Sequence, residues 1–134
     1  MIDLVDIIKN TKNKKLLYVE DNQEARETTK LILEEFFDNI VVAIDGQDGY
    51  EKFRNNDIDL IITDINMPKL NGLEMISKVR DIDNNVSVLI LSAHNEPEFL
   101  NYSIQLNIDS YLLKPIDIDL FLEALTKINS KYKA

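Results

Sequence analysis

Polar residues that can do chemistry follow four short apolar runs of this sequence. The stretch "IITDINMPKLNG" (61–72) shows the pattern, because β-forming residues end on the carboxylate of Asp64 and a turn follows. A charge at the end of a buried strand costs free energy unless it is solvated, paired or used. These residues therefore either cap turns or form one site: Glu20 with Asp21, Asp64, Ser92 and Lys114.

Three carboxylates held together repel one another. At a separation of 4 Å, each pair costs about 1 kcal/mol in bulk water and about 4 kcal/mol at an effective dielectric constant of 20. A site that gathers Glu20, Asp21 and Asp64 needs positive charge, of which Lys114 supplies one unit and a divalent cation the rest. The chain has no Cys and one His, so oxygen ligands favour Mg²⁺ over zinc or copper, with Mn²⁺ as an alternative.

The elements that position these residues follow from the hydropathy pattern. Apolar runs predict strands at 16–19, 40–44, 58–63, 86–92 and 111–113. Several runs are apolar nearly throughout, which is typical of parallel strands covered on both faces. Segments of helical period lie between and after them, at 22–37, 46–55, 71–82, 97–106 and 117–131. Asn71 and Glu74 suit a capping box, and Pro97 suits the first turn of a helix.

This order predicts an α/β fold, a doubly wound (βα)₅ unit with a five-stranded parallel sheet and the flavodoxin-like strand order 2-1-3-4-5. In such a sheet, ligands bind at the carboxyl ends of the strands, so the polar residues that follow the strands converge on one edge. The predicted domain spans 15–132. The segment 1–14 is a predicted N-terminal extension, either a short helix or the edge of a partner contact.

Composition narrows the class of protein. The chain has 134 residues, 45% hydrophobic and 29% charged, as expected for one domain with a core. It has no Cys, no apolar stretch near the roughly 20 residues that span a bilayer, and acids where a signal peptide carries bases, so we expect a cytoplasmic protein with no membrane contact. The net charge of −9 argues against direct nucleic-acid binding.

Four ordered motifs resemble those of chemotaxis-regulator-like receiver domains of bacterial two-component response regulators. They are "LYVEDN" (17–22), "DLIITDINMPKLNGLEMI" (59–76), "ILSAH" (90–94) and "YLLKP" (111–115). The resemblance covers about 15–131, nearly the whole chain. It implies that Asp64 is a phospho-acceptor, that Glu20 and Asp21 hold Mg²⁺ with Asp64, and that the backbone carbonyl of Asn66 is a further ligand. Lys114 is the implied catalytic lysine, before a proline expected to be cis.

The resemblance also implies how a signal would pass through the domain. Ser92 and Tyr111 are the implied switch residues, and His94 and Asn66 stand at positions that tune how long the phosphoryl group lasts. A sensor histidine kinase or a phosphotransfer protein is the implied donor, and the chain would catalyse only its own phosphorylation and dephosphorylation. Output would leave through the face of 97–106, 111–113 and 117–131, to a protein target, a fused output domain or a phosphorylation-dependent homodimer partner.

Two residues depart from the family pattern in ways that affect the backbone. Gly49 stands inside the second predicted helix and is expected to weaken it by up to about 1 kcal/mol. Asn107 stands where Gly is common before the last strand, so we expect a left-handed conformation there.

Rival functions share part of this pattern. A flavodoxin-like FMN carrier would have the same sheet, but it needs a phosphate loop rich in Ser, Thr and Gly where this chain has "EDNQEAR" (20–26). A degenerate receiver that acts only as a protein-contact module predicts loss of Asp64 or Lys114, and both are present. Whether the receiver stands alone or belongs to a longer protein stays open.

Overall fold

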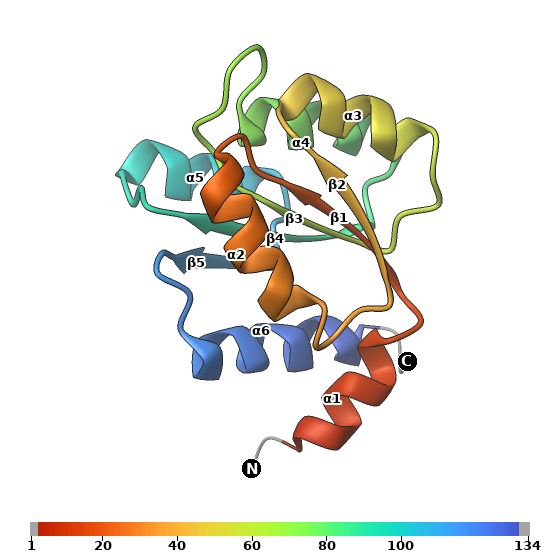
Figure 1. The fold of residues 1–134 in the computed structure, drawn as a ribbon. Helices are drawn as coiled ribbons and strands as arrows, with labels where there is room; N and C mark the ends of the chain where they lie inside the picture. Colours follow the sequence, from red (N-terminus) through yellow and green to blue (C-terminus); the bar gives the residue numbers. More distant parts are fainter. Residues whose placement is uncertain (1–2, 132–134) are drawn as a thin grey trace.

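A parallel β-sheet forms the centre of the computed structural model, which describes residues 3–131. Its strands are β1 (Lys15–Val19), β2 (Asn39–Ala43), β3 (Leu60–Thr63), β4 (Ser87–Ser92) and β5 (Ser110–Leu113). They are ordered β2-β1-β3-β4-β5, and every neighbouring pair is parallel. The predicted doubly wound sheet with order 2-1-3-4-5 is therefore confirmed (Figure 1).

Helices cover both faces of this sheet (Figure 1). One face carries α1 (Leu4–Thr11), α2 (Gln23–Leu33) and α6 (Ile118–Ser130). The other face carries α3 (Gly46–Arg54), α4 (Gly72–Ile82) and α5 (Pro97–Gln105). The chain moves from β1 outward to β2 and then back across the sheet to β3, β4 and β5. Right-handed crossovers therefore place α2 on one face and α3, α4 and α5 on the other.

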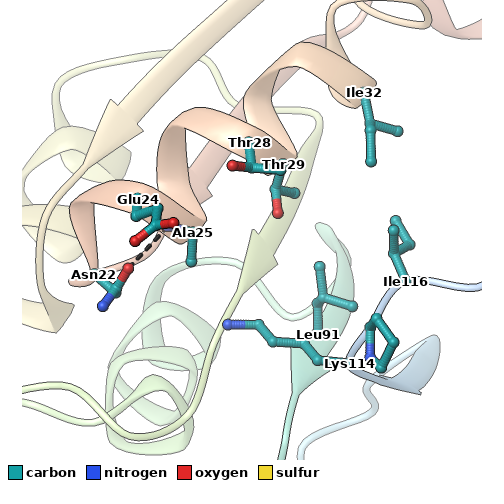
Figure 2. A pocket seen from close by; sticks show the side chains of 10 residues that line it. Asn22, Glu24, Ala25, Thr28, Thr29, Ile32, Leu91, Lys114 and Ile116 are labelled. Carbon is teal, nitrogen blue, oxygen red and sulfur yellow. Dashed lines mark hydrogen bonds between the residues drawn. The ribbon is translucent and has the colours of Figure 1, made fainter.

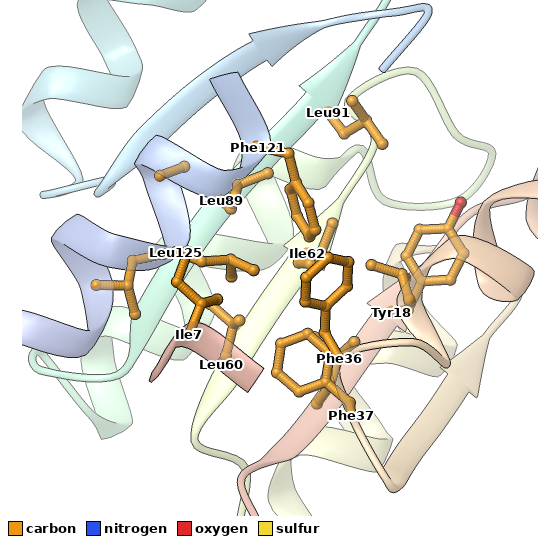
Figure 3. Packing of buried hydrophobic residues seen from close by; sticks show 14 residues of the cluster. Ile7, Tyr18, Phe36, Phe37, Leu60, Ile62, Leu89, Leu91, Phe121 and Leu125 are labelled. Carbon is orange, nitrogen blue, oxygen red and sulfur yellow. The ribbon is translucent and has the colours of Figure 1, made fainter. Parts of the chain in front are cut away.

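Alternate residues of each central strand enter two separate hydrophobic cores. In β1, Leu16 and Tyr18 belong to the core under α2 and α6, which Figure 3 shows, whereas Leu17 and Val19 belong to the core under α3 and α4. The strands β3 and β4 are buried throughout. Burial on both faces explains why these runs are apolar without alternation.

The helix after β1 is shorter than the sequence predicts. The helical period covers 22–37, but α2 ends at Leu33, and Asn22 is its N-cap. Phe36 and Phe37 follow in a turn and are buried. The turn brings the ring of Phe36 against Phe121 edge to face, with 5.4 Å between ring centroids (Figure 3). The other predicted elements lie within two residues of the observed bounds.

Local signals for helix ends act as predicted. Asn71 Oδ1 accepts from the Glu74 N–H at 2.8 Å, and Glu74 Oε1 accepts from the Asn71 N–H at 3.0 Å, which completes the capping box of α4. Pro97 begins α5. Asn107 has a φ of 58°, the expected left-handed conformation. The capping box starts α4 directly after the loop that follows Asp64.

Gly49 has a packing role that its helix propensity does not reveal. A Cβ at this position would lie 2.6 Å from Met75 Sδ and 3.0 Å from Val19 Cγ2. The glycine therefore allows α3 to approach β1 and α4 closely, whatever it costs the helix itself.

The N-terminal helix α1 packs against α6 (Figure 1). Ile7 is buried, and Thr11 Oγ1 donates to the Phe36 carbonyl at 2.7 Å. Of the predicted ranges 1–14 and 15–132, residues 1–2 and 132 lie outside the described residues. Within 3–131, no helix has the length and apolar character that crossing a membrane requires.

Candidate functional site

Three carboxylates gather where β1 and β3 end. Glu20 and Asp21 follow β1, Asp64 follows β3, and one oxygen of each lies within 4.8 Å of the others. Backbone hydrogen bonds continue the sheet to this point. The Glu20 N–H donates to the Ala43 carbonyl and the Asp64 N–H to the Val19 carbonyl, both at 3.1 Å. The sheet thus brings together the acidic residues that the sequence assigns to one site.

Lys114 reaches this cluster from the end of β5. Its Nζ lies 2.5 Å from Glu20 Oε1 and 3.0 Å from Asp64 Oδ2. The Glu20 side chain is only 2% exposed and the Asp64 side chain 13%, whereas Asp21 is exposed. Lys114 therefore compensates the two more buried carboxylates and leaves Asp21 to solvent. The peptide bond from Lys114 to Pro115 is cis, as the sequence predicts.

Burial and pairing change the ionisation of the groups that Lys114 joins. Burial raises the pKa of the Glu20 carboxyl, although the hydrogen bond from Lys114 opposes the rise and the charge of Asp64 adds to it. Burial by itself lowers the pKa of Lys114, but its hydrogen bonds to Glu20 and Asp64 outweigh that effect, so the pKa is raised overall. The lysine is therefore held in its charged form.

The loop after Asp64 is folded back onto β3. Asp64 Oδ1 accepts from the Ile65 N–H at 2.7 Å, and the Ile65 carbonyl accepts from the Gly72 N–H at 2.8 Å. A Cβ on Gly72 would lie 1.9 Å from the Asp64 carbonyl oxygen, so only glycine permits this approach. Lys69, with a φ of 67°, completes the turn. The backbone on both sides of the Asp64 carboxylate is thus held by hydrogen bonds and close packing.

His94 links the remaining predicted residues. Its N–H donates to Ser92 Oγ at 3.1 Å, and its carbonyl accepts from the Tyr111 hydroxyl. Its ring Nε2 lies 2.5 Å from Asn66 Nδ2, and Nδ1 lies 3.3 Å from Glu96 Oε1. His94, two residues after the end of β4, therefore contacts three parts of the domain. These are the loop after Asp64, the last residue of β4, and β5. The sequence placed His94 near the site but did not reveal these contacts.

One hydrogen-bonded contact at the site is not predicted by the sequence. Arg26 Nη1 donates to the Glu20 carbonyl at 2.8 Å and to the Asp21 carbonyl at 3.3 Å. This bond ties the first turns of α2 to the acidic pair. Its only sequence signal is a cation a few residues after "ED", which is too common a pattern to single out.

A pocket of about 540 Å³ opens beside this site, between α2 and the segment after β5 (Figure 2). Figure 2 shows the Lys114 side chain opposite α2, which contributes small and apolar groups. The residues of α2 that line it include Ala25, Thr28, Thr29 and Ile32. The Lys114 side chain is therefore accessible from the pocket beside α2 as well as from the acidic cluster.

This fold with this site defines a class of signalling domain. Residues 16–126 match the model of the response regulator receiver domain, and the chain belongs to that family. Chemotaxis protein CheY of Treponema pallidum is 29% identical over 117 residues, covering 85% of this chain and 81% of that protein. Transcriptional regulatory protein DegU of Brevibacillus brevis is 33% identical over 112 residues, covering 82% of this chain. This chain spans only 48% of the length of that DegU.

Solved structures support the same assignment. The N-terminal domain of an uncharacterized protein from Wolinella succinogenes superposes with a TM-score of 0.81 at 34% identity, over 89% of this chain and 96% of that chain. The CheX-CheY-BeF3-Mg+2 complex from Borrelia burgdorferi contains a chain with a TM-score of 0.77 at 25% identity, covering 87% of this chain and 90% of that one. The predicted resemblance to chemotaxis-type receivers is confirmed.

Proposed function

We propose that this chain is a phosphorylatable switch that accepts a phosphoryl group on Asp64. The observation that carries the proposal is Lys114, whose ammonium contacts Asp64 and Glu20 together at the carboxyl edge of the sheet. Phosphoryl transfer depends mainly on positioning and on neutralising the charge of the incoming group. Membership in the receiver family supports the same function.

The acidic cluster suits a divalent cation. Glu20, Asp21 and Asp64 offer oxygen atoms only, close enough together to share one ion, and hard cations prefer such donors. The backbone carbonyl of Asn66 is the proposed additional ligand. Mg²⁺, or Mn²⁺ in its place, would neutralise charge on the transferring phosphoryl oxygens.

In the proposed reaction, a carboxylate oxygen of Asp64 attacks the phosphorus of a phosphohistidine on a sensor histidine kinase or a phosphotransfer protein. The O–P bond forms as the P–N bond breaks, and the electron pair of that bond stays on the imidazole nitrogen. Lys114 and the Ile65 N–H orient the two oxygens of Asp64. Water later cleaves the acyl phosphate and restores Asp64, so the chain catalyses only its own modification.

The signal is proposed to leave through the side of the domain made by α5, β5 and α6. Ser92 would turn its hydroxyl toward the new phosphoryl group, which releases the His94 N–H and moves the residue that holds Tyr111. Exposed apolar side chains on this face support the proposal, because such side chains suit a binding surface. They are Leu100, Tyr102 and Ile104 of α5, Leu113 of β5 and Leu120 of α6.

The proposed partners are all proteins. Upstream is the phosphohistidine donor, and downstream is a cytoplasmic protein target, a fused output domain or a second phosphorylated copy. Longer relatives such as DegU, named as a transcriptional regulator, support the fused form. His94 and Asn66 touch each other over the loop of Asp64, so we propose that they set the lifetime of the phosphoryl group.

The proposal is tested by the intact mass of the protein after incubation with Mg²⁺ and acetyl phosphate. The unmodified chain should gain one phosphoryl group, and the chelator-treated sample and the Asp64→Asn variant should gain none. Beryllofluoride should bind with Mg²⁺ as an acyl phosphate mimic. If neither phosphoryl transfer nor beryllofluoride binding occurs, Asp64 is not an acceptor and the chain acts only as a contact module. Tight binding of FMN instead would support the electron-carrier alternative.

A further inference from the structure

An apolar groove lies where α1, α2 and α6 meet, away from the acidic cluster. Its volume is about 460 Å³. We call it the α1 groove, and its apolar lining consists chiefly of Leu4, Ile8, Leu31, Phe36, Ile118 and Leu122. The family model matches residues 16–126, so α1 adds a side to this groove that the matched region does not contain. Ile32 lines both this groove and the pocket beside Lys114.

The groove is formed before any partner arrives. Ile7 is buried under α1, Thr11 Oγ1 donates to the Phe36 carbonyl at 2.7 Å, and Lys12 Nζ lies 3.2 Å from Asp38 Oδ1. These contacts hold α1 in place, yet Leu31 remains 68% exposed and Leu4 49% exposed. Apolar side chains that line a preformed groove and stay in water mark a surface for binding.

The charges around the groove decide what kind of occupant it suits. Glu35 is the charged residue in its lining. Glu27 lies one turn before Leu31 and Asp119 one turn before Leu122, and both are exposed. On α1, Lys12 lies one turn after Ile8, but its charge is paired with that of Asp38. The apolar floor therefore has acidic borders.

Acidic borders disfavour a second copy of this chain as the occupant. Each copy carries a net charge of −9, and a self-complementary contact would bring the same carboxylates of two chains together. An occupant with positive charge meets attraction in the same place. A helix fits the shape because its apolar residues recur on one side while cations flank them.

We propose that the α1 groove binds a cationic amphipathic helix of another protein. Apolar side chains spaced three and four residues apart would enter between α1 and α6, and Lys or Arg residues would lie over Glu27, Glu35 and Asp119. The proposal does not rest on phosphorylation, because the lining of the groove contains none of the residues proposed to take part in it. Intact mass measures phosphorylation of Asp64 in the same samples. Failure of peptide binding can therefore be distinguished from failure of phosphorylation.

The test uses synthetic peptides of about 15 residues, long enough to form a helix when bound. The probe is an amphipathic Leu/Lys peptide with an apolar stripe. Its controls are a scrambled peptide of the same composition and a Leu/Glu peptide with the same stripe. We expect saturable binding of the probe by fluorescence anisotropy, at least about tenfold tighter than either control. Amide shifts in an NMR titration of the full chain should concentrate on the groove.

Matched variants distinguish binding in the α1 groove from nonspecific attraction to the charged surface. Leu31→Gln removes an exposed apolar side chain without adding charge, and Gln suits a helix nearly as well. It should weaken binding of the probe about tenfold or more. Ile82→Gln makes the same kind of change at the end of α4, where the side chain is 54% exposed, and should leave binding unchanged. Thermal melting by circular dichroism checks that both variants fold.

Three results would overturn the proposal. Equal binding of the scrambled peptide would mean that charge alone attracts the probe. Equal weakening by Ile82→Gln and Leu31→Gln would place the contact elsewhere or make it unspecific. A dimer seen by sedimentation that Leu31→Gln dissociates would mean that a second copy occupies the groove.

Discussion

Lys114 Nζ donates to Asp64 Oδ2 at 3.0 Å, although the two residues lie 50 positions apart in the sequence. The same ammonium contacts Glu20, so one cation connects the ends of β1, β3 and β5. It offsets the repulsion between two carboxylates that the sheet places side by side. Lys114 is therefore the cation that pairs directly with both of the more buried carboxylates.

Replacing Lys114 by Met should lower the initial rate of phosphorylation by acetyl phosphate at least about a hundredfold, because a preorganised positive charge at the acceptor is lost. Intact mass against time gives the rate. Lys127→Met is the matched control, since Lys127 donates to the Asp109 carbonyl, away from the site. A rate in Lys114→Met close to that of the control would show that the lysine is only structural.

Replacing Ser92 by Ala should separate phosphorylation from signalling. Ser92 is fully buried and accepts from the His94 N–H, so the variant should lose about 1 kcal/mol of stability. It should still be phosphorylated, but NMR signals of the Tyr111 ring should no longer shift on adding beryllofluoride. Ser103→Ala, which removes a hydroxyl from α5, should keep the shift. An unchanged Tyr111 response in Ser92→Ala would exclude Ser92 from the switch.

Replacing Gly72 by Ala should destabilise the domain by at least about 2 kcal/mol. The new Cβ would lie 1.9 Å from the Asp64 carbonyl oxygen, so the loop must move away from β3. Urea denaturation measures the loss, and the rate of phosphorylation should fall as Asp64 shifts. Asp81→Ala, an exposed change on the same helix, should alter stability by less than about 0.5 kcal/mol. Equal stability of the two variants would refute the close approach.

Replacing Tyr18 by Phe should change how stability depends on alkaline pH. The Tyr18 side chain is buried, and this burial raises the pKa of Tyr18 from 10.0 to about 12. Between these values the unfolded chain loses the proton and the folded chain keeps it, so the free energy of unfolding falls as pH rises.

The size of this effect follows from the shift in pKa. The stability of the unmodified chain relative to Tyr18→Phe should fall by about 2 kcal/mol from pH 10 to about pH 12, measured by urea denaturation across that range. Lys114 also has a raised pKa, so its stabilising contribution is complete below 10.5 and declines as pH rises through its folded pKa. That decline occurs in both proteins and cancels in the comparison. Parallel curves for the two proteins would contradict the burial of the hydroxyl.

The sequence was sufficient to predict the order of the sheet and most residues of the candidate site. Strands buried on both faces are apolar along their whole length, so β1, β3 and β4 can be recognised locally. Parallel order then requires that Glu20, Asp64 and Lys114 meet at one edge. The ordered motifs supplied the expected roles, and the capping signals at Asn71 and Pro97 located the helices.

Long-range packing decided what the sequence left open. The period of apolar residues did not reveal the end of α2, because Phe36 serves the core equally well from a turn. Nor did it reveal that Glu20 is buried while Asp21 is exposed, or that His94 contacts Asn66. Exposure, crossing contacts and grooves depend on which distant residues pack together. A local pattern specifies the conformation of a segment, but its neighbours in space appear only once the chain has folded.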